Sequence, residues 1–443
     1  MKAILATGTA VVATLAAVLT GGAASAHPDQ HFYTTKTPYA PQESRSRYQS
    51  PPRGYQPIFT ENVARHGSRA MTGADDGDAL LAVLQEAATQ HALTGLGGRL
   101  APQVQALLAG AETIGYGNLA GRGEQEQQQT ARRLEKRLPT LFQTIAAKHE
   151  PIEVVTSGVT RAVASANAFT GGLAAGDPAI APLIQAPVTN KDLLYFHKQP
   201  QNADYQAYLD SDPELAATLA AIDGKPQTAA AADHVVGRLF THGFVAAMAS
   251  ADRIGFARSL FELYTSAPDL SVEAPGVDLD PFLPAADAAW FAYLDDAEEF
   301  YSSGPAFRGR TITYDMARPL LDDLFAQASA KAHGTSDAGA VLRFTHAEEV
   351  EPLAVLLGLP GSTQGAAASR PYTYANNPWR GATVAPMAAN IQWDLYAGPG
   401  HYLVRMLYNE KETAFRAGCR PIARGSYFYD LAELERCYDV RLG

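Results

Sequence analysis

Near its N-terminus the chain reads Pro57-Ile58-Phe59-Thr60-Glu61-Asn62-Val63-Ala64 and then Arg65-His66-Gly67-Ser68-Arg69. The first stretch has no helical period and predicts a strand. The second places two guanidinium groups around one imidazole where that strand ends, and Gly67 between them is expected to let a ligand approach the backbone. An imidazole can take up a phosphoryl group covalently, and guanidinium groups donate paired hydrogen bonds to its oxygens. The pattern therefore favours phosphoryl transfer, and the alternative is a basic surface turn with an incidental histidine.

Two further predicted strands also end in polar loops. Pro151–Thr156 is followed by Ser157, Gly158 and Arg161, and Ala340–Thr345 runs into His346-Ala347-Glu348. In an open, mostly parallel sheet, ligands bind at the carboxyl ends of the strands, so we expect the three loops to converge. A helix is expected after each of the last two loops, over residues 162–173 and 349–358.

The polar residues of these loops have roles in such chemistry. Arg161 stands where a helix begins, and a cation there opposes the helix dipole unless an anion lies nearby; the alternative is an exposed arginine paired with a carboxylate. His346 can donate to a phosphoryl oxygen, and Glu348 can protonate the leaving alkoxide and later deprotonate water. The alternative for Glu348 is an ordinary acid in a first helical turn, like Glu349 and Glu351. The helix lowers the pKa of Glu348 and bound phosphates raise it; we expect the substrate to dominate, with best activity at acidic to neutral pH.

Composition restricts the class of protein. The chain has 443 residues, is 47% hydrophobic and carries 35 Lys and Arg against 46 Asp and Glu, for a net charge of −11. A general nucleic-acid partner is therefore not expected, and a polyanionic ligand must meet a local basic pocket.

The N-terminal residues 1–26 have the pattern of a secretory signal. Lys2 is followed by an apolar stretch, Ile4–Thr20, and by Ala24-Ser25-Ala26, a small-residue cleavage pattern. A membrane anchor is the weaker alternative, because Thr7, Gly8 and Thr9 interrupt the apolar run. No later stretch is apolar enough to span a bilayer. We expect a secreted, extracellular monomer, cleaved near Ala26, without a membrane partner.

The two cysteines of the chain are Cys419 and Cys437, close to the C-terminus. In an oxidising compartment they predict one disulfide, worth about 3 kcal/mol. A zinc site or a redox pair is the weaker alternative. The acid clusters Asp75-Asp76-Gly77-Asp78 and Asp295-Asp296 lack a metal-binding pattern, and the second fits a solvated helix face. We assign no metal and no cofactor.

The predicted organisation is an α/β body with an insertion. Residues 27–57 form an extended N-terminal arm, residues 58–174 and 311–443 an α/β domain with a mostly parallel central sheet and flanking helices, and residues 175–310 an alanine-rich, mainly helical insertion. Helices are expected in the insertion over residues 213–222, 234–250 and 285–302.

The chain resembles the acid phosphatase branch of the histidine phosphatase superfamily, and within it the multiple inositol polyphosphate phosphatases. Residues 65–69 match the RHGxR motif of the branch, and residues 346–348 match the HAE triplet of the subfamily. Thr35–Tyr39, Thr156–Arg161 and Leu403–Glu410 are also similar, whereas Ala70-Met71 departs from the proline usual after the motif. The resemblance implies an α/β domain with a helical insertion and assigns the site residues: His66 as nucleophile, Arg65, Arg69, Arg161 and His346 as phosphate ligands, and Glu348 as proton donor.

From this resemblance we expect a secreted phosphomonoesterase that hydrolyses phytate and other inositol polyphosphates through a phosphohistidine, without a cofactor. Lys191, His197 and Lys198 are expected to contact outer phosphates, and their alternative is a solvated basic face. A broad-specificity acid phosphatase or a sugar phosphatase would share every catalytic residue. From a different class, a non-catalytic inositol-phosphate-binding protein would keep the arginines but not turn over.

Overall fold

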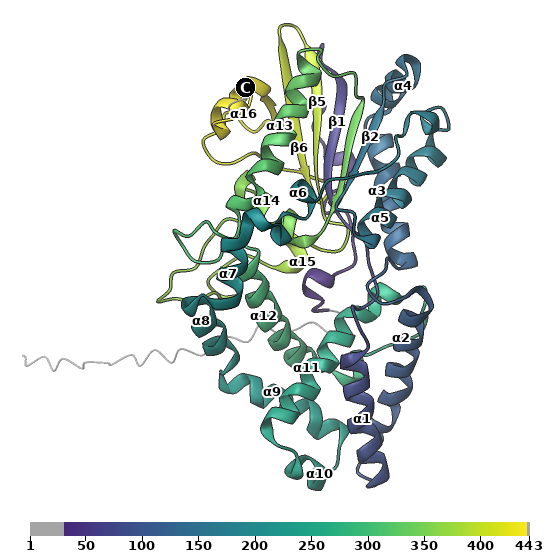
Figure 1. Cartoon of the computed structure of the whole chain (residues 1–443), viewed down its shortest axis with the longest axis vertical. Coiled ribbons are helices and arrows are strands. Elements are labelled where there is room, and N and C mark those ends of the chain that lie inside the picture. Colours follow the sequence, from purple (N-terminus) through teal and green to yellow (C-terminus); the bar gives the residue numbers. More distant parts are fainter. Residues whose placement is uncertain (1–30, 441–443) are drawn as a thin grey trace, which may run out of the picture. The chain divides into compact units, whose positions relative to one another are not determined.

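The centre of the fold is an eight-stranded mixed sheet, seen in a computed structural model that describes residues 31–440 (Figure 1). The strand order is β3-β2-β4-β1-β5-β6-β7, with β8 paired to β6. The parallel part comprises β1 (Gln56–Arg65), β2 (Ile152–Thr156), β3 (Val188–Thr189) and β4 (Ala340–Thr345). The antiparallel part comprises β5 (Asn390–Gly398), β6 (His401–Tyr408), β7 (Lys411–Glu412) and β8 (Phe428–Asp430).

The sheet confirms the predicted α/β class, but the expected mostly parallel order holds only from β1 to β4. β5 pairs antiparallel with β1, and β6 antiparallel with β5. The reason is local, because only Pro399 and Gly400 connect β5 to β6, and a two-residue connection forces the chain straight back. Gly400 has φ +79°, a conformation that glycine adopts without strain.

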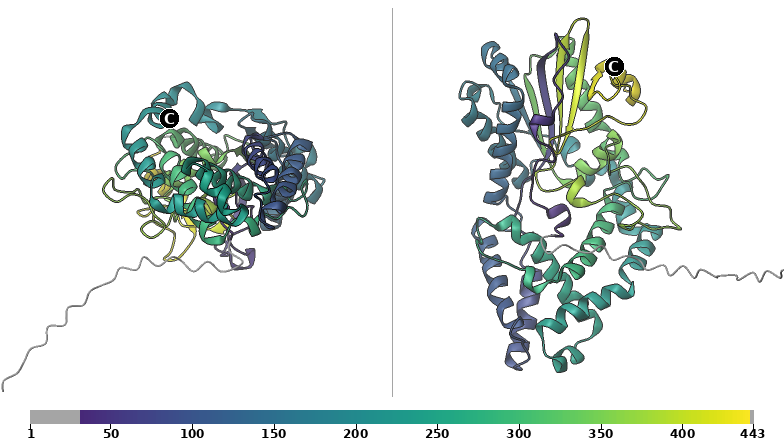
Figure 2. Two further views of the ribbon diagram at one scale, coloured as in Figure 1. Left: turned by 90° about the horizontal axis from the view of Figure 1, so that it is seen from below. Right: turned by 180° about the vertical axis from the view of Figure 1, so that it is seen from behind.

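Helices cover both faces of the sheet (Figures 1 and 2). β4 is consequently buried along its whole length, which explains the apolar residues on both of its sides. One face carries α3 (Gly121–Arg137), α4 (Pro139–Lys148) and α5 (Thr160–Gly176); the other carries α13 (Arg318–Ala332), α14 (Ala347–Leu357) and α16 (Leu431–Tyr438). α5 and α14 confirm the two helices expected after the polar loops.

A group of helices lies beyond the carboxyl ends of the parallel strands (Figure 1). Its members are α1 (Asp75–Thr89), α2 (Leu100–Ile114), α7 (Ala203–Ser211), α8 (Pro213–Asp223), α9 (Pro226–Leu239), α10 (His242–Ala247), α11 (Ser250–Ser266) and α12 (Ala285–Ser302). The helices predicted over 213–222 and 285–302 are present. The single helix expected over 234–250 is wrong, because Phe240 is extended and forms a β-bridge with Leu93.

In the structure, the expected insertion does not separate from the α/β domain at the predicted limits. Residues from His31 onward form one compact unit. α1 packs against α11 although it precedes the expected insertion, whereas β3 and α6 (Lys191–Leu194), inside the expected insertion, lie against β2 and β4. The limits at residues 174 and 310 therefore stay predictions.

The N-terminal part is described only in part. The expected signal segment, residues 1–26, lies outside the described residues. From residue 31 the arm contains two short 3₁₀ turns, Thr34–Lys36 and Arg45–Arg47, between extended stretches. In the described range, no helix has the length and apolar character needed to cross a membrane.

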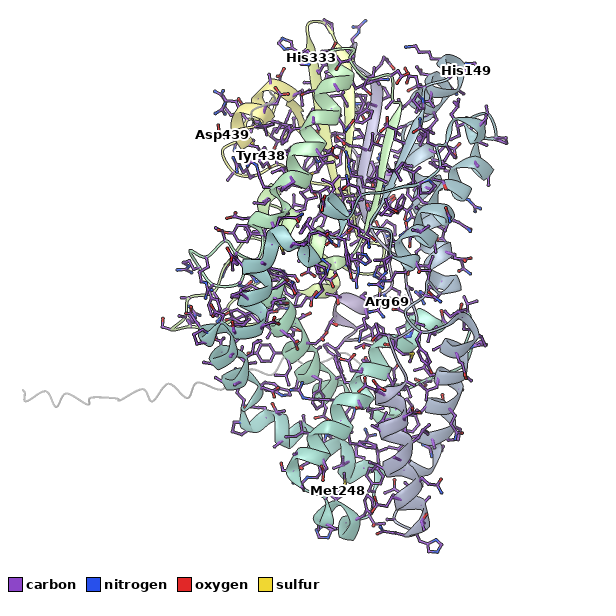
Figure 3. All side chains as sticks on the ribbon, viewed as in Figure 1. Arg69, His149, Met248, His333, Tyr438 and Asp439 are labelled. Carbon is purple, nitrogen blue, oxygen red and sulfur yellow. A yellow bond between two sulfur atoms is a disulfide. The ribbon has the colours of Figure 1, made fainter. Side chains whose placement is uncertain are left out.

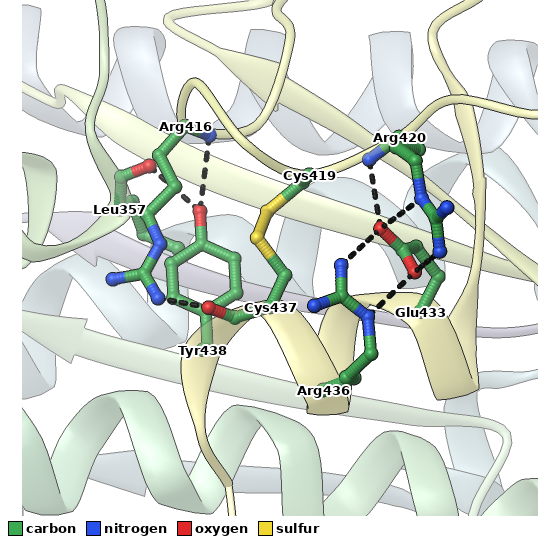
Figure 4. The surroundings of a disulfide bond; sticks show 8 residues. All are labelled: Leu357, Arg416, Cys419, Arg420, Glu433, Arg436, Cys437 and Tyr438. Carbon is green, nitrogen blue, oxygen red and sulfur yellow. Dashed lines mark hydrogen bonds and ion pairs between the residues drawn. A yellow bond between two sulfur atoms is a disulfide. The ribbon is translucent and has the colours of Figure 1, made fainter.

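The predicted disulfide is present between Cys419 and Cys437 (Figure 4). It joins the segment after β7 to α16. The Tyr438 hydroxyl donates to the Leu357 carbonyl at 2.7 Å and accepts from the Arg416 N–H at 3.2 Å, so the end of α16 is also tied to the end of α14.

The contact between α3 and α5 provides a stability test at two neighbouring glycines. A Cβ on Gly172 would lie 2.8 Å from Gln128 Cα, whereas a Cβ on Gly171 would meet nothing within 4 Å. We expect Gly172→Ala to lower the free energy of unfolding by about 1–3 kcal/mol. Gly171→Ala is the matched control and should raise it by up to about 1 kcal/mol. Urea unfolding measures both, and equal effects would contradict the packing.

Candidate active site

The three predicted loops meet at one edge of the sheet because their strands are neighbours in the order β2-β4-β1. Arg65 is in register with Thr345, and the His66 N–H donates to the Thr345 carbonyl at 2.9 Å. On the other side of β4, the Ser157 N–H donates to the Phe344 carbonyl at 3.1 Å. Figure 3 shows Arg69 at this edge, beside the group of helices, with His149 and His333 at the opposite end of the sheet.

His66 is fixed in a form suited to nucleophilic attack. Its side chain is 2% exposed, and Nδ1 lies 2.9 Å from the Gly67 carbonyl oxygen. A carbonyl can only accept, so Nδ1 carries the proton and Nε2 carries the free electron pair. Burial, together with the charge of Arg65, holds the pKa of His66 well below its usual range. The imidazole is therefore neutral at the pH of the expected chemistry.

His346 faces His66, with ring centroids 5.3 Å apart. Its Nε2 lies 2.9 Å from the Ser157 hydroxyl oxygen, which also accepts from the Val159 N–H at 3.3 Å. When Ser157 donates its proton to Nε2, the ring N–H lies on Nδ1, the atom that is buried without a partner among the described residues. Burial lowers the pKa of His346 to about 3, which leaves the ring neutral.

Three arginines complete the site with unused donors. Within the described residues, the Nε atoms of Arg65, Arg69 and Arg161 and the Nδ1 of His346 are buried without a hydrogen-bond partner. Burial and the charges of Arg161 and Arg65 lower the pKa of Arg69 to about 10, as expected where like charges are crowded. A buried N–H without a partner is costly, and an anion would satisfy all four donors.

Backbone groups hold this arrangement in place. Arg65 Nη1 donates to the carbonyls of Thr35 and Ala385, each at 2.5 Å, so the N-terminal arm helps to fix it. The N-termini of α5 and α14 also lie at this edge, since they follow directly after the loops. Their N–H groups favour negative charge at the same place.

Glu348 is the second residue of α14 and is partly exposed. Burial raises its pKa, but the charges of His197, His346 and Arg65 outweigh that effect and lower the pKa to about 2. The carboxylate is thus ionised in the substrate-free protein. The lowered pKa of Glu348 has the direction expected from the helix terminus. The expected rise of this pKa when substrate binds stays a prediction.

Of the predicted outer contacts, His197 lies close enough to Glu348 and His346 for its charge to act on their pKa values. Lys191, at the start of α6, and Lys198 are exposed. His197 is 4% exposed, and its Nδ1 lies 2.5 Å from Glu349 Oε1, while Glu349 Oε2 accepts from the Thr345 hydroxyl at 3.0 Å. Although burial opposes its charge, the bond to Glu349 raises the pKa of His197. The role of these residues as outer phosphate ligands stays a prediction.

The expected reason for Gly67 is wrong. A Cβ at this position would lie 2.6 Å from the Cα of Gly123, and a Cβ on Gly123 would lie 2.2 Å from the Ser68 carbonyl oxygen. Helix α3, and not a ligand, occupies the space that the missing side chain leaves. Both glycines allow this helix to pack directly against residues 65–69, the proposed catalytic loop.

The acid clusters have structural explanations. Asp75, Asp76 and Asp78 form the first turn of α1, where the helix dipole favours carboxylates. The expected solvated face at Asp295-Asp296 is wrong, because Asp296 is 2% exposed and accepts from the Tyr374 hydroxyl at 2.6 Å. Over residues 31–440, no three His, Cys, Asp or Glu side chains are grouped as metal ligands.

Several residues at the site were missed from the sequence. Tyr195 packs its ring edge-to-face on His346 and His197, with centroids 5.2 Å and 4.7 Å away. The Ser165 hydroxyl accepts from the Gly67 N–H at 3.1 Å. Neither residue stands at a strand end; Ser165 belongs to a stretch that resembles the family, but nothing in the sequence indicates its contact with Gly67.

A cavity of about 220 Å³ begins at Arg69. Lys36 of the arm contributes to its wall, bonded to Glu262 and, at 3.1 Å, to the Thr265 hydroxyl. Met71, Asp75 and Asp76 also line it. Glu262 completes three carboxylates in its lining against two cations, and of the site residues only Arg69 lines it.

Comparison with known proteins defines the family. A family model described as histidine phosphatase superfamily (branch 2) matches residues 59–205 and 258–409. The chain therefore belongs to branch 2 of the histidine phosphatase superfamily and is a phosphatase.

Two multiple inositol polyphosphate phosphatases and a phytase are among the similar proteins. The crystal structure of the Bifidobacterium longum multiple inositol polyphosphate phosphatase with phosphate is 32% identical, covers 92% of this chain and 97% of that one, and has a TM-score of 0.86. Multiple inositol polyphosphate phosphatase 1 of Gallus gallus is 24% identical over 336 residues, which are 72% of this chain and 70% of that protein. The phytase of D. castellii shares the fold at 15% identity, with a TM-score of 0.67 over 92% of this chain and 84% of that one. The predicted family resemblance is confirmed.

The Ser157 hydroxyl can be tested as the group that orients His346. In Ser157→Ala, Nε2 loses its donor and the ring can adopt the other tautomer, which turns a lone pair toward the phosphate. We expect kcat/KM for an aryl phosphate to fall about tenfold. Thr170→Ala, on the far side of α5, should leave kcat/KM unchanged. An unaltered Ser157→Ala enzyme would contradict this role.

Proposed function

We propose that the protein is an exported phosphomonoesterase that hydrolyses phytate and other inositol polyphosphates through a phosphohistidine at His66. One observation carries the chemical part of the proposal. A neutral imidazole with a free Nε2 is surrounded by buried N–H donors of Arg65, Arg69, Arg161 and His346 that have no partner in the described part of the chain. Such donors suit the oxygens of a phosphoryl group in transfer.

The first step forms the covalent intermediate. His66 Nε2 attacks phosphorus, the P–N bond forms, and the bond to the ester oxygen breaks. The guanidinium groups hold the three remaining oxygens, on which charge accumulates. Glu348, protonated in the complex, gives its proton to the leaving alkoxide.

The second step releases phosphate. Glu348, now a carboxylate, takes a proton from water as the water oxygen attacks phosphorus, and the P–N bond breaks. His66 is again neutral and Glu348 again protonated. Substrate phosphates beside Glu348 oppose the cations that lower its pKa in the free protein, so activity is expected at acidic to neutral pH.

The substrate class is supported by the relatives. The Bifidobacterium longum relative has also been solved with inositol hexasulfate, at 32% identity to this chain. We propose further phosphate contacts at Lys36, which is paired with Glu262, and at the exposed Lys191 and Lys198. A broad-specificity acid phosphatase or a sugar phosphatase is the alternative, because the catalytic residues would be the same.

Export is supported by the N-terminal sequence and by the disulfide. The signal-like pattern of residues 1–26 lies outside the described residues. The disulfide between Cys419 and Cys437 is typical of an oxidising compartment.

The substrate proposal is tested by turnover on three substrates. We expect kcat/KM for phytate to exceed the values for p-nitrophenyl phosphate and glucose 6-phosphate, because only phytate can use the additional cations. His66→Ala should lose at least about 10⁴-fold in kcat on each substrate, and the exposed His242→Ala is the matched control. Poorer turnover of phytate than of both small esters would leave only the broad-specificity alternative. Hydrolysis at the wild-type rate by His66→Ala would refute the phosphohistidine.

The role of Glu348 is tested by leaving groups. An alkoxide needs a proton to leave and a nitrophenolate does not, so Glu348→Gln should lower kcat on phytate by about 10²–10⁴-fold and on p-nitrophenyl phosphate much less. Glu349→Gln, one residue further along α14, is the comparison because its carboxylate is bonded to His197. Equal losses on both substrates in Glu348→Gln would contradict a proton-donor role.

A further inference from the structure

Ser68, between His66 and Arg69 in the catalytic loop, is held by two carboxyl groups from distant parts of the chain. Its side chain is fully buried. Its N–H donates to Glu126 Oε2 at 2.8 Å, and its Oγ lies 2.9 Å from Glu126 Oε1 and 2.9 Å from Asp269 Oδ1. Glu126 belongs to α3, and Asp269 to the 3₁₀ turn Ala267–Leu270 that follows α11.

If both acids were ionised, the Ser68 hydroxyl would have too few protons for hydrogen bonds to both carboxylate oxygens. A serine hydroxyl has one proton, so it can donate to one of the two carboxylates only. The other oxygen at 2.9 Å would then be a carboxylate facing the lone pairs of Oγ. A second proton, on one of the carboxyl groups, turns this repulsion into a second hydrogen bond.

The surroundings indicate which acid holds that proton. Glu126 also accepts from the Tyr39 N–H at 3.0 Å and lies 3.7 Å from Arg122 Nε, so its charge is well compensated. In the described part of the chain, Ser68 is the hydrogen-bond partner of the Asp269 carboxyl, which is 1% exposed. Arg65 and Arg69 face it from the catalytic loop, but neither forms an ion pair with it.

We propose that Asp269 is a positioning residue that acts as a neutral acid: it donates to Ser68 Oγ, and Ser68 donates to Glu126. This chain of hydrogen bonds fixes the segment between His66 and Arg69 against α3 on one side and against the group of helices on the other. The inference rests on the proposed phosphate site and adds a residue that holds its geometry. It assigns a function in the active site to a part of the chain remote in sequence from the motifs.

The electrostatic balance agrees with this assignment. Burial, with a contribution from Glu126, raises the pKa of Asp269 to about 8, and the nearby Arg69 and Arg65 reduce the shift. Loss of the proton above that pH would set two carboxylates against one hydroxyl. The loop would then shift, and the added negative charge beside Arg69 would weaken the binding of an anion.

The test measures the binding of sulfate, which stays a dianion across the range, in wild type, Asp269→Asn and Asp269→Ala. Asn keeps a donor at the same place and does not titrate, whereas Ala loses the donor. At about pH 6, we expect Asp269→Asn to bind sulfate within about twofold of wild type and Asp269→Ala about tenfold more weakly. Between about pH 7 and 9.5, wild type should lose about tenfold in affinity while Asp269→Asn stays level, measured as the ratio of their dissociation constants.

Turnover supplies the second measurement. At about pH 6, kcat/KM for p-nitrophenyl phosphate should be retained in Asp269→Asn and fall about tenfold in Asp269→Ala, and thermal unfolding verifies that each variant is folded. Binding in Asp269→Asn that differs tenfold from wild type at this pH would show an ionised Asp269 and overturn the proposal. So would wild-type binding and turnover in Asp269→Ala. A wild-type protein that does not bind sulfate at all would overturn the phosphate site itself, and this inference with it.

Discussion

The rest of the structure depends on keeping three guanidinium groups and two imidazoles buried together at one edge of the sheet. Their mutual repulsion and desolvation oppose this arrangement, as the lowered pKa values of His66, His346 and Arg69 show. Fixed dipoles compensate for it in part. Carbonyl groups hold Arg65 and His66, and the Ser157 hydroxyl holds His346. These bonds leave Arg65 Nε, His66 Nε2 and His346 Nδ1 without a hydrogen-bond partner among the described residues. The donors and the nucleophile are therefore already in position before an anion binds.

Three separate parts of the chain are needed to support this geometry. The parallel order β2-β4-β1 aligns the loops, the N-terminal arm supplies the Thr35 carbonyl, and α3 packs on the loop through the Gly67 and Gly123 contact. Asp269 connects the same loop to the group of helices beyond the sheet. The helices are therefore joined to this loop by a hydrogen bond.

What the sequence predicts well is local. β4 and α12 match the expected limits. The proposed catalytic residues could be singled out because they directly follow predicted strands and match the motifs of the family. The antiparallel part of the sheet was missed because a strand's pattern does not specify the direction of its neighbour. Phe240 interrupts a stretch with good helical pattern because its bridge to Leu93, far back in the chain, is more favourable.

The contacts at the site that the sequence did not predict were missed for the same reason, because they join distant parts of the chain. The partners of Ser68 lie 58 and 201 positions away, so no spacing in the sequence connects them. His197 was expected to contact an outer phosphate and Asp296 to lie on a solvated helix face, yet each is buried with a specific partner, Glu349 and Tyr374. Buried polar pairs of this kind depend on tertiary packing, which a single sequence does not show.

The central claim is that His66 carries the phosphoryl group between two displacements. Hydrolysis of a phosphorothioate monoester made chiral at phosphorus with ¹⁸O, in water enriched in ¹⁷O, tests it directly by the configuration of the inorganic thiophosphate released. Two in-line displacements, first by Nε2 of His66 and then by water, predict overall retention of configuration. Inversion would mean that water attacks the substrate in one step, with His66 acting only as a neighbour, and would contradict the account.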